Sequence, residues 1–290
     1  MAYLLGYILL NGGILLFTEA FFHQKIGGKI RLFYFSLKEL VEGIRSGILL
    51  MLGNFSSVLM TSMDRLFVKA LIGEVGFAQY SFAVRMENFL NTVTTPITVT
   101  MYNHFCIHDK PEENTKMRQR VMVFASVVIA AAFPVKFLLE TYLQDYYDCV
   151  TVLFLLFASQ MFYVLVKGVY VNLYHARKQQ KRYFSDLIWV ITFGFVANVL
   201  GYLLFQTKEA FAVATLLSAM FWLGKSQFYF RDMNWQDAGY LLAQLGVFLI
   251  TGSLLPSVVG FLVYVIWTLI GVFLFVRPVW DWAMGVIKKR

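Results

Sequence analysis

The sequence predicts an all-α protein, a polytopic membrane bundle of about nine transmembrane helices. Hydrophobic residues make up 59% of the chain and charged residues 14%, whereas a soluble domain carries about 25% charged residues. The apolar residues occur in long continuous runs, and a spanning helix needs ~20 of them. The runs do not show the alternating segments of about ten residues that mark a transmembrane β-barrel. We interpret the following runs as spanning segments: 1–22, 46–69, 77–106, 121–139, 150–173, 184–205, 210–230, 238–254 and 258–276.

The positive charge gathers at alternate connections between these segments. Of the 25 Lys and Arg residues, 18 lie in the connections that would share one side of the membrane and in the C-terminal tail. Those stretches are 23–45, 107–120, 174–183, 231–237 and 277–290. Because positive residues mark cytoplasmic connections, the sequence predicts a multi-pass protein of a cell membrane with a cytoplasmic C-terminus. The net charge of +8 is therefore interpreted as topological, and no nucleic acid partner is expected.

The first segment, 1–22, is apolar from its first residues. It lacks the basic region and the small-residue cleavage site of a signal peptide. On the predicted topology it begins outside the cell, which is an unusual start for a polytopic protein. The connection 23–45, with its semi-polar stretch LFYFSLKELVEGIR, is expected to lie along the cytoplasmic surface.

The next two segments, 46–69 and 77–106, carry polar stripes. Four residues of the first recur at spacings of three and four, which places them on one helical face: Asn54, Ser57, Thr61 and Asp64. A similar series follows in the second: Arg85, Asn88, Asn91, Thr95 and Thr98. Each charge inside a bilayer costs ~2.5–3.5 kcal/mol on insertion scales, so such residues face a bundle interior or a water-filled cavity. For the hydroxyl residues the alternative is hydrogen bonding between helices, and Pro96 is expected to kink the second helix.

Two of these charges are predicted to form an ion pair. Asp64 and Arg85 lie at similar distances from the turn near residues 74 and 75, ~13–16 Å along antiparallel helices. Opposite charges at equal depth in a medium of low dielectric constant are expected to pair. Arg65 points about 100° away from Asp64 on a helix and is free to meet a substrate or Glu87.

The remaining segments contain few residues that could bind a ligand or a metal or form a disulfide. Lys167 either meets an anion or extends to the nearby inner interface. Cys106 and Cys149 fall on opposite membrane faces, so a disulfide within the chain is not expected. His104, near His108, is interpreted as an interfacial histidine rather than a metal ligand. No P-loop or dinucleotide fingerprint is found, so neither a cofactor nor a metal is expected.

Two stretches together resemble one family of transporters. The first, GILLMLGNFSSVLMTSMDRLFVKALIGEVGFAQYSFAVRMENFL, has Asp64-Arg65 late in a helix, a glycine-bearing turn, and then Gly76, Tyr80, Ser81 and Ala83. The second, LYHARKQQKRYFSDLIWVITFGFVANVLGYLLF, has a basic loop and a helix with an internal Asn198, and is followed by the small residues Ala210, Ala214 and Ser218. Over roughly residues 1–230 the chain resembles the bacterial polysaccharide and O-antigen flippases of the multidrug/oligosaccharidyl-lipid/polysaccharide exporter superfamily.

The resemblance implies an architecture. Members have about fourteen helices in two pseudo-symmetric lobes, and the nine predicted here fit helices six to fourteen. Segment 1–22 would then be the last helix of a missing N-terminal lobe, 23–45 a cytoplasmic connection, 46–230 the C-terminal lobe, and 231–290 two extra helices with a basic tail. A late gene start, a truncated remnant or a separate polypeptide supplying the other lobe would each account for the missing helices. The isolated chain is expected to be inactive.

The resemblance also implies a function and a site in the bacterial inner membrane. The protein would flip a polyprenyl-diphosphate-linked oligosaccharide between leaflets for surface polysaccharide biosynthesis. Arg65 and Arg85 would meet the diphosphate, and Asn54, Asn88 and Asn91 would meet sugar hydroxyls. The expected partners are the lipid bilayer, the lipid-linked oligosaccharide and a missing N-terminal lobe.

Two other functions remain open. An ion-coupled multidrug antiporter of the same superfamily would need an acidic membrane site, which Asp64 and Glu87 could supply, although nearby Arg residues favour anionic cargo. A membrane glycosyltransferase or polymerase would need a large external loop, and the longest predicted external connection has about ten residues (140–149). The chain is therefore not expected to be an enzyme.

Overall fold

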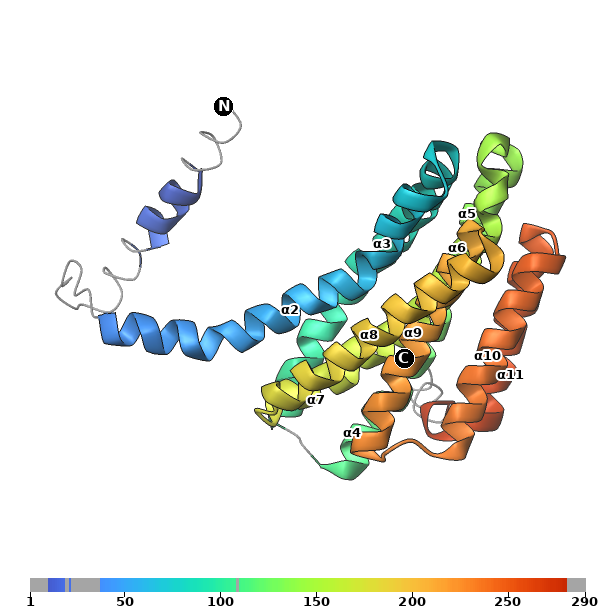
Figure 1. Cartoon of the computed structure of the whole chain (residues 1–290). Helices are drawn as coiled ribbons and strands as arrows, with labels where there is room; N and C mark the ends of the chain where they lie inside the picture. Colours follow the sequence, from blue (N-terminus) through green and yellow to red (C-terminus); the bar gives the residue numbers. More distant parts are fainter. Residues whose placement is uncertain (1–9, 19–20, 22–36, 108–109, 281–290) are drawn as a thin grey trace. The chain divides into compact units, whose positions relative to one another are not determined.

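A computed structural model of the chain describes residues 10–18, 21, 37–107 and 110–280 (Figure 1). The chain divides into two compact units, residues 1–47 and 48–290. In the first unit, residues 10–18 are helical, and most of the predicted segment 1–22 and of the connection 23–45 lies outside the described residues.

The described residues form helices and no strands, as the predicted all-α class requires. Two long helices follow the helical residues 10–18: α2 (Leu37–Leu71) and α3 (Glu74–Ile107). The central elements are α4 (Pro111–Ile129), α5 (Ala132–Thr141), the 3-10 helix η1 (Gln144–Cys149), α6 (Val150–Leu165), the π-helix η2 (Val166–Val171) and α7 (Asn172–Ala176). The last elements are α8 (Gln180–Phe205), α9 (Lys208–Phe230), α10 (Trp235–Leu254) and α11 (Ser257–Phe275).

Several of these helices could cross a membrane. Within the described residues, five helical stretches are long and apolar enough: Pro111–Thr141, Gln144–Ala176, Gln180–Phe205, Trp235–Leu254 and Ser257–Phe275. Nine were predicted: α2, α3 and α9 have the length but not the same apolarity, and the predicted segment 1–22 lies mostly outside the described residues. Polar residues interrupt all three helices, as the sequence of α2 and α3 had indicated. An all-helical unit with several such helices has the length and composition of a helical membrane protein.

Local sequence explains where the helices end. The turn between α2 and α3 contains Gly73 at φ 91°, a conformation that a glycine adopts without steric cost. Helix α4 begins at Pro111. Proline suits the first position of a helix, because the backbone N–H that it lacks would have no partner within the helix. Helices α8 and α9 each end on a residue in the left-handed region, Gln206 and Arg231. Because α4 starts ten residues before the predicted apolar run, much of the connection 107–120 is helical rather than extended.

The helix that contains α6 is the centre of the second unit. Of its most apolar stretch, 89% is buried, and α6 packs against α3, α4, α9 and α10. Large aromatic side chains fill the spaces around it, among them Phe154, Phe157 and Tyr163. Helices α10 and α11 pack against α6 and α5, so the two C-terminal helices belong to the same compact unit as the rest of residues 48–290.

The connections of this unit lie at its two ends (Figure 1). The turns after α2, α5, α8 and α10 share one end, and those after α3, α7 and α9 share the other. This is the grouping that the sequence predicts from alternate crossings. We call the second end the basic end, because its connections 107–120, 174–183 and 231–237 carry most of the Lys and Arg of the unit's connections.

Candidate functional site

Asp64 lies in the interior between three helices. Its side chain is 4% exposed. The Tyr80 hydroxyl of α3 donates a hydrogen bond of 2.5 Å to Oδ2, the Thr215 hydroxyl of α9 donates one of 3.2 Å to the same oxygen, and the Arg65 backbone N–H donates one of 2.8 Å to Oδ1. Both carboxylate oxygens therefore accept hydrogen bonds, and Asp64 links α2 to α3 and α9.

The predicted ion pair between Asp64 and Arg85 is not formed. Among the described residues, the partners of Asp64 are those of the preceding paragraph, and Arg85 is exposed on α3. The spacing argument placed both residues at a similar depth but did not fix the rotation of α3 about its axis. The rotation that buries Tyr80, Ala83, Val84 and Glu87 turns Arg85 outward.

A second polar group of the interior surrounds Glu87, which is 8% exposed. The Gln160 side-chain amide of α6 donates a hydrogen bond of 2.6 Å to Glu87 Oε1, and the charges of Arg65 and Lys167 are near enough to act on this carboxylate. The Tyr163 hydroxyl, with Lys167 Nζ 5.4 Å from the centre of its ring, is adjacent. We call Arg65, Glu87, Gln160, Tyr163 and Lys167 the Glu87 cluster.

Several buried atoms of the Glu87 cluster lack a hydrogen-bond partner among the described residues. They are Arg65 Nε, Gln160 Oε1 and the Tyr163 hydroxyl. More than nine in ten buried polar groups in folded proteins are hydrogen-bonded, so each exception needs an explanation, such as a bound water or ligand. The cluster therefore has polar atoms to which a bound water or ligand could form hydrogen bonds.

Lys167 also lines an open pocket of about 920 Å³. The remaining lining residues come from α2, α3, the helix α6–α7 and α8: Val58, Thr95, Thr98, Val99, Tyr102, Val171, Asn172, His175, Gln180 and Tyr183. We call this the Lys167 pocket. Its walls present hydroxyl, amide and imidazole groups within a surface that is mostly apolar, and it reaches the basic end of the unit at His175 and Gln180.

The π-helix η2 shapes one wall of this pocket. Residues Val166–Val171 form this widened turn, and π-turns within α-helices often occur at functional sites. The Asn172 side-chain amide donates hydrogen bonds to the Thr98 carbonyl at 2.7 Å and to the Gly168 carbonyl at 2.9 Å. The first of these bonds connects α3 to the helix that carries Lys167.

The residues predicted to bind substrate are not all brought together. Arg65 reaches the Glu87 cluster, but Arg85 and Asn88 are exposed, and Asn91 donates a hydrogen bond of 3.3 Å to Asn88 on its own helix. The side chain of Asn54 lies outside the described residues. The sequence reasoning missed Gln160, Tyr163 and Asn172, whose only signal was a polar or hydroxyl group inside an apolar run.

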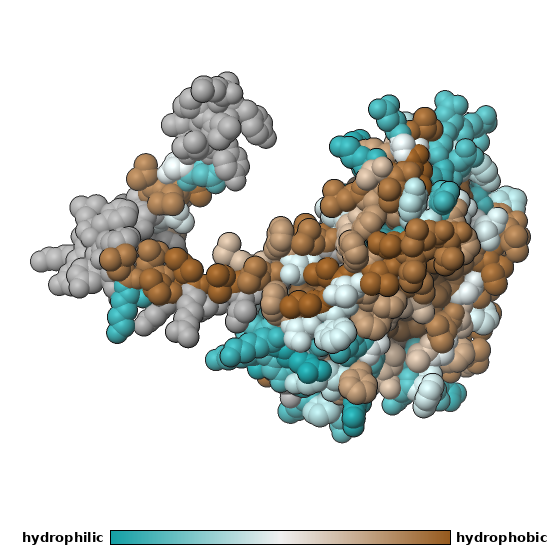
Figure 2. Space-filling model, in the orientation of Figure 1, coloured by the Kyte–Doolittle hydropathy of each residue, from teal (hydrophilic) through white to brown (hydrophobic). Residues whose placement is uncertain are grey.

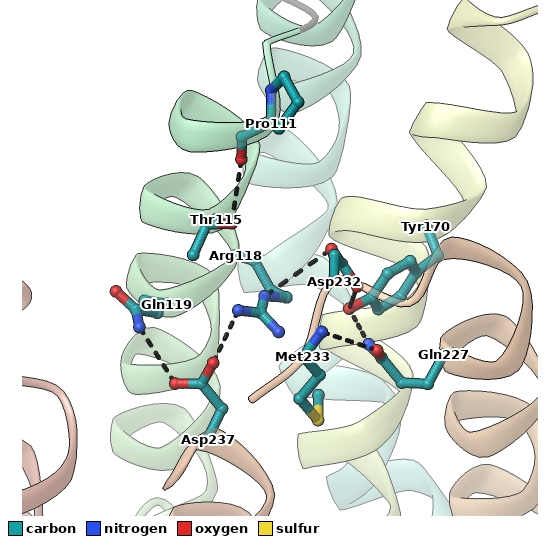
Figure 3. A network of polar contacts seen from close by, with 9 residues as sticks. All are labelled: Pro111, Thr115, Arg118, Gln119, Tyr170, Gln227, Asp232, Met233 and Asp237. Atoms are coloured by element: carbon teal, nitrogen blue, oxygen red, sulfur yellow. Dashed lines mark hydrogen bonds and ion pairs between the residues drawn. The ribbon is translucent and has the colours of Figure 1, made fainter. Parts of the chain in front are cut away.

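A separate buried network joins four elements at the basic end (Figure 3). Arg118 of α4 is 1% exposed, and its Nη2 lies 2.7 Å from Asp237 Oδ2 of α10. Gln119 donates a hydrogen bond of 3.1 Å to the other oxygen of Asp237. Asp232, 3.9 Å from Arg118 Nε, accepts a hydrogen bond of 3.2 Å from the Tyr170 hydroxyl of η2. This Arg118 network ties α10 and the preceding loop to α4 and to the π-helix.

The structure offers no clear metal centre. Within the described residues, no group of three or more His, Cys, Asp or Glu residues could hold a metal ion. His104 is described, but its neighbour His108 lies outside the described residues. Cys106, exposed, and Cys149, buried, are both free.

No family model, curated protein or solved structure matches the chain. The resemblance to polysaccharide flippases therefore stays a prediction from sequence motifs. The geometry that bears on function is the Lys167 pocket, together with the polar cluster beside it.

Proposed function

We propose that this chain is part of a membrane transporter that carries a polyprenyl-diphosphate-linked oligosaccharide from the inner to the outer leaflet of a bacterial inner membrane. The observation that carries the proposal is the Lys167 pocket, a space of about 920 Å³ into which a lysine and several hydroxyl and amide side chains project from largely apolar walls. A diphosphate and its sugars cannot cross hydrocarbon unaided, because polar and charged groups lose their hydration there. A pocket with such side chains at the basic end would receive them.

The pocket has suitable chemistry for such a headgroup. Lys167 supplies a cation for a phosphate, and lysine is a common phosphate ligand in proteins. Thr95, Thr98 and Gln180 supply hydroxyl and amide groups for sugar hydroxyls. Arg65, whose Nε is buried and has no hydrogen-bond partner among the described residues, gives a second cation in the adjacent Glu87 cluster.

The charge distribution supports entry of the cargo from the cytoplasmic side. His175, Gln180 and Tyr183 line the pocket next to the turn between α7 and α8, in a connection that carries four basic residues. Positive connections lie on the cytoplasmic side, where a lipid-linked sugar would be assembled. With this orientation the C-terminus would lie in the cytoplasm.

An ion-coupled antiporter remains the second candidate, because Asp64 and Glu87 are both buried. Buried carboxylates in membrane proteins often serve ion or proton pathways. However, both oxygens of Asp64 are engaged by Tyr80, Thr215 and the Arg65 backbone, and cationic Arg65 and Lys167 lie near Glu87. The cations favour an anionic cargo over an organic cation.

A binding experiment tests the proposal without requiring the chain to transport by itself. The full chain in lipid nanodiscs would be titrated with a polyprenyl-diphosphate-linked disaccharide, and binding would be followed by microscale thermophoresis. We expect Lys167→Met to weaken binding about tenfold or more, because a hydrogen bond to a charged group contributes ~1.5–3 kcal/mol. Lys181→Met, which removes an exposed lysine from the same end, should leave binding unchanged.

Two results would overturn this function. One is the absence of saturable binding to the diphosphate-linked sugar, and the other is equal binding by the Lys167 and Lys181 variants. Saturable binding of a lipophilic organic cation in place of the sugar, lost in Glu87→Gln, would favour the antiporter.

A further inference from the structure

An apolar groove of about 490 Å³ runs between α8 and α9, away from the Lys167 pocket. Its lining is almost wholly apolar: Phe193, Val196, Ala197, Leu200, Gly201, Leu204, Phe205, Ala210, Val213, Ala214 and Leu217, with Thr207 and Glu209 at one end. We call this the α8–α9 groove, and we propose that it holds one hydrocarbon chain of a phospholipid whose headgroup carries an amine.

Small residues create the groove. A Cβ added at Gly201 would lie 3.3 Å from the Ala210 carbonyl oxygen, and one added at Gly194 would lie 3.1 Å from the Ser218 hydroxyl. The two helix backbones therefore approach closely, as small residues permit in membranes. The larger side chains of Leu200 and Val213 also line the groove.

The groove is open along the exposed side of α8. Only 22% of the most apolar stretch of α8 is buried, and Leu200, Leu204 and Phe205 are 51%, 73% and 67% exposed. Figure 2 shows that hydrophobic residues cover a broad band of this unit between hydrophilic ends. In a bilayer this band would face lipid chains directly.

The length of the groove matches one leaflet. From Phe193 to Phe205 the axis of α8 rises ~18 Å, and half of a ~30 Å hydrocarbon core is ~15 Å. One end of the groove lies near the middle of α8 and the other at the turn before α9. A single acyl chain of the leaflet at that end would therefore fit along its length.

Charge at the rim selects the headgroup. Glu209 lines the groove at the end beside the turn between α8 and α9. The neighbouring Lys208 does not line the groove and instead donates a hydrogen bond to Gln79 of α3. The connection 140–149 at the same end has three acidic residues and no basic one. A carboxylate there attracts the ammonium group of an ethanolamine headgroup and repels a diphosphate, so the occupant is a phospholipid rather than the polyprenyl cargo.

Native mass spectrometry of the full chain tests this inference. The protein would be purified in mild detergent and incubated with an equimolar mixture of phosphatidylethanolamine and phosphatidylglycerol. We expect one phosphatidylethanolamine to remain bound after activation. Ala197→Trp, which fills the groove, should reduce its retention about tenfold, equivalent to ~1.4 kcal/mol, whereas Val263→Trp on the exposed face of α11 should not.

The rim carries a second variant that leaves the shape of the groove intact. Glu209→Gln should lower the preference for phosphatidylethanolamine over phosphatidylglycerol about two- to fivefold, since a half-exposed ion pair contributes up to ~1 kcal/mol. If Ala197→Trp prevents folding, Val213→Trp on the facing helix fills the same space.

The inference would be overturned if no lipid were retained above the level of bulk detergent exchange, if the groove and control variants retained lipid equally, or if a polyprenyl diphosphate were retained in preference to phospholipid. A second copy of the chain bound at this face, and lost in Ala197→Trp, would also contradict it. Because the readout is lipid retention and needs no sugar binding, its failure is distinguishable from failure of the proposed function.

Discussion

The buried ion pair between Arg118 and Asp237 should be a main determinant of how firmly α10 is held. Both side chains are 1% exposed and their charged atoms lie 2.7 Å apart. Replacing Arg118 by Met leaves a buried carboxylate with one remaining donor, the Gln119 amide at 3.1 Å. Breaking a buried pair in this way lowers the free energy of unfolding by ~3–5 kcal/mol. Because Asp237 keeps its hydrogen bond from Gln119, we expect a loss at the lower end, ~3 kcal/mol.

Thermal unfolding of the purified chain in detergent, followed by tryptophan fluorescence, measures the loss. A change of 1 kcal/mol shifts Tm by roughly 2–4 °C for a chain of about this size, so Arg118→Met should lower Tm by roughly 6–12 °C. Lys116→Met, an exposed lysine two residues earlier on α4, is the matched control and should shift Tm by less than about 2 °C.

A double-mutant cycle separates the pair from simple loss of packing. Replacing both partners by apolar residues of similar size, Arg118→Met with Asp237→Leu, removes the stranded charge. The double variant should therefore be more stable than either single variant. If the two losses simply add, or if Arg118→Met alone leaves Tm unchanged, the reasoning from burial is refuted.

Three further changes follow from the packing. Gly252→Ala should destabilise the chain by ~1–3 kcal/mol, because a Cβ there would lie 2.1 Å from the Phe154 ring; thermal melting measures the loss, and full stability would show that the ring moves freely. Lys136→Met should cost ~3 kcal/mol, since this buried ammonium donates hydrogen bonds of 2.8 and 2.7 Å to carbonyls at the end of α10; hydrogen exchange should rise there and not in α8. Tyr80→Phe should cost ~1–3 kcal/mol by removing a donor from buried Asp64, and a chemical denaturation midpoint equal to that of the wild type would contradict this.

The sequence predicted the class of fold because composition and run length depend little on detail. Continuous apolar runs and alternate basic connections indicated a helical membrane protein, and the structure shows long apolar helices with connections grouped at two ends. The polar stripe of α2 correctly indicated that Asp64 is buried. What the sequence could not fix was helix rotation, which turns Arg85 outward and leaves Asp64 to Tyr80 and Thr215.

The site was harder to predict than the fold for a second reason. Gln160 and Tyr163 are single polar groups within an apolar run, and only the approach of Glu87 from another helix gives Gln160 a role. Asn172 likewise gains its meaning from the Thr98 carbonyl, 2.7 Å away and 74 residues earlier in the chain. Such pairings depend on tertiary contacts, which no local spacing rule contains.

The π-helix η2 is a place where the chain could lose one residue without a change in the direction of its helix. A π-turn holds one more residue than an α-turn, so the segment Val166–Val171 contains a residue that the helix axis does not need. Deleting one residue here, for instance Val169, would let the turn close as an ordinary α-turn. The flanking helical stretches would then keep their faces in phase. The same deletion within α6 would rotate everything beyond it by about 100°. In evolutionary terms, this is the place in the most buried helix where a single-codon insertion or deletion could be accepted, and where related chains could differ in length without a change of fold.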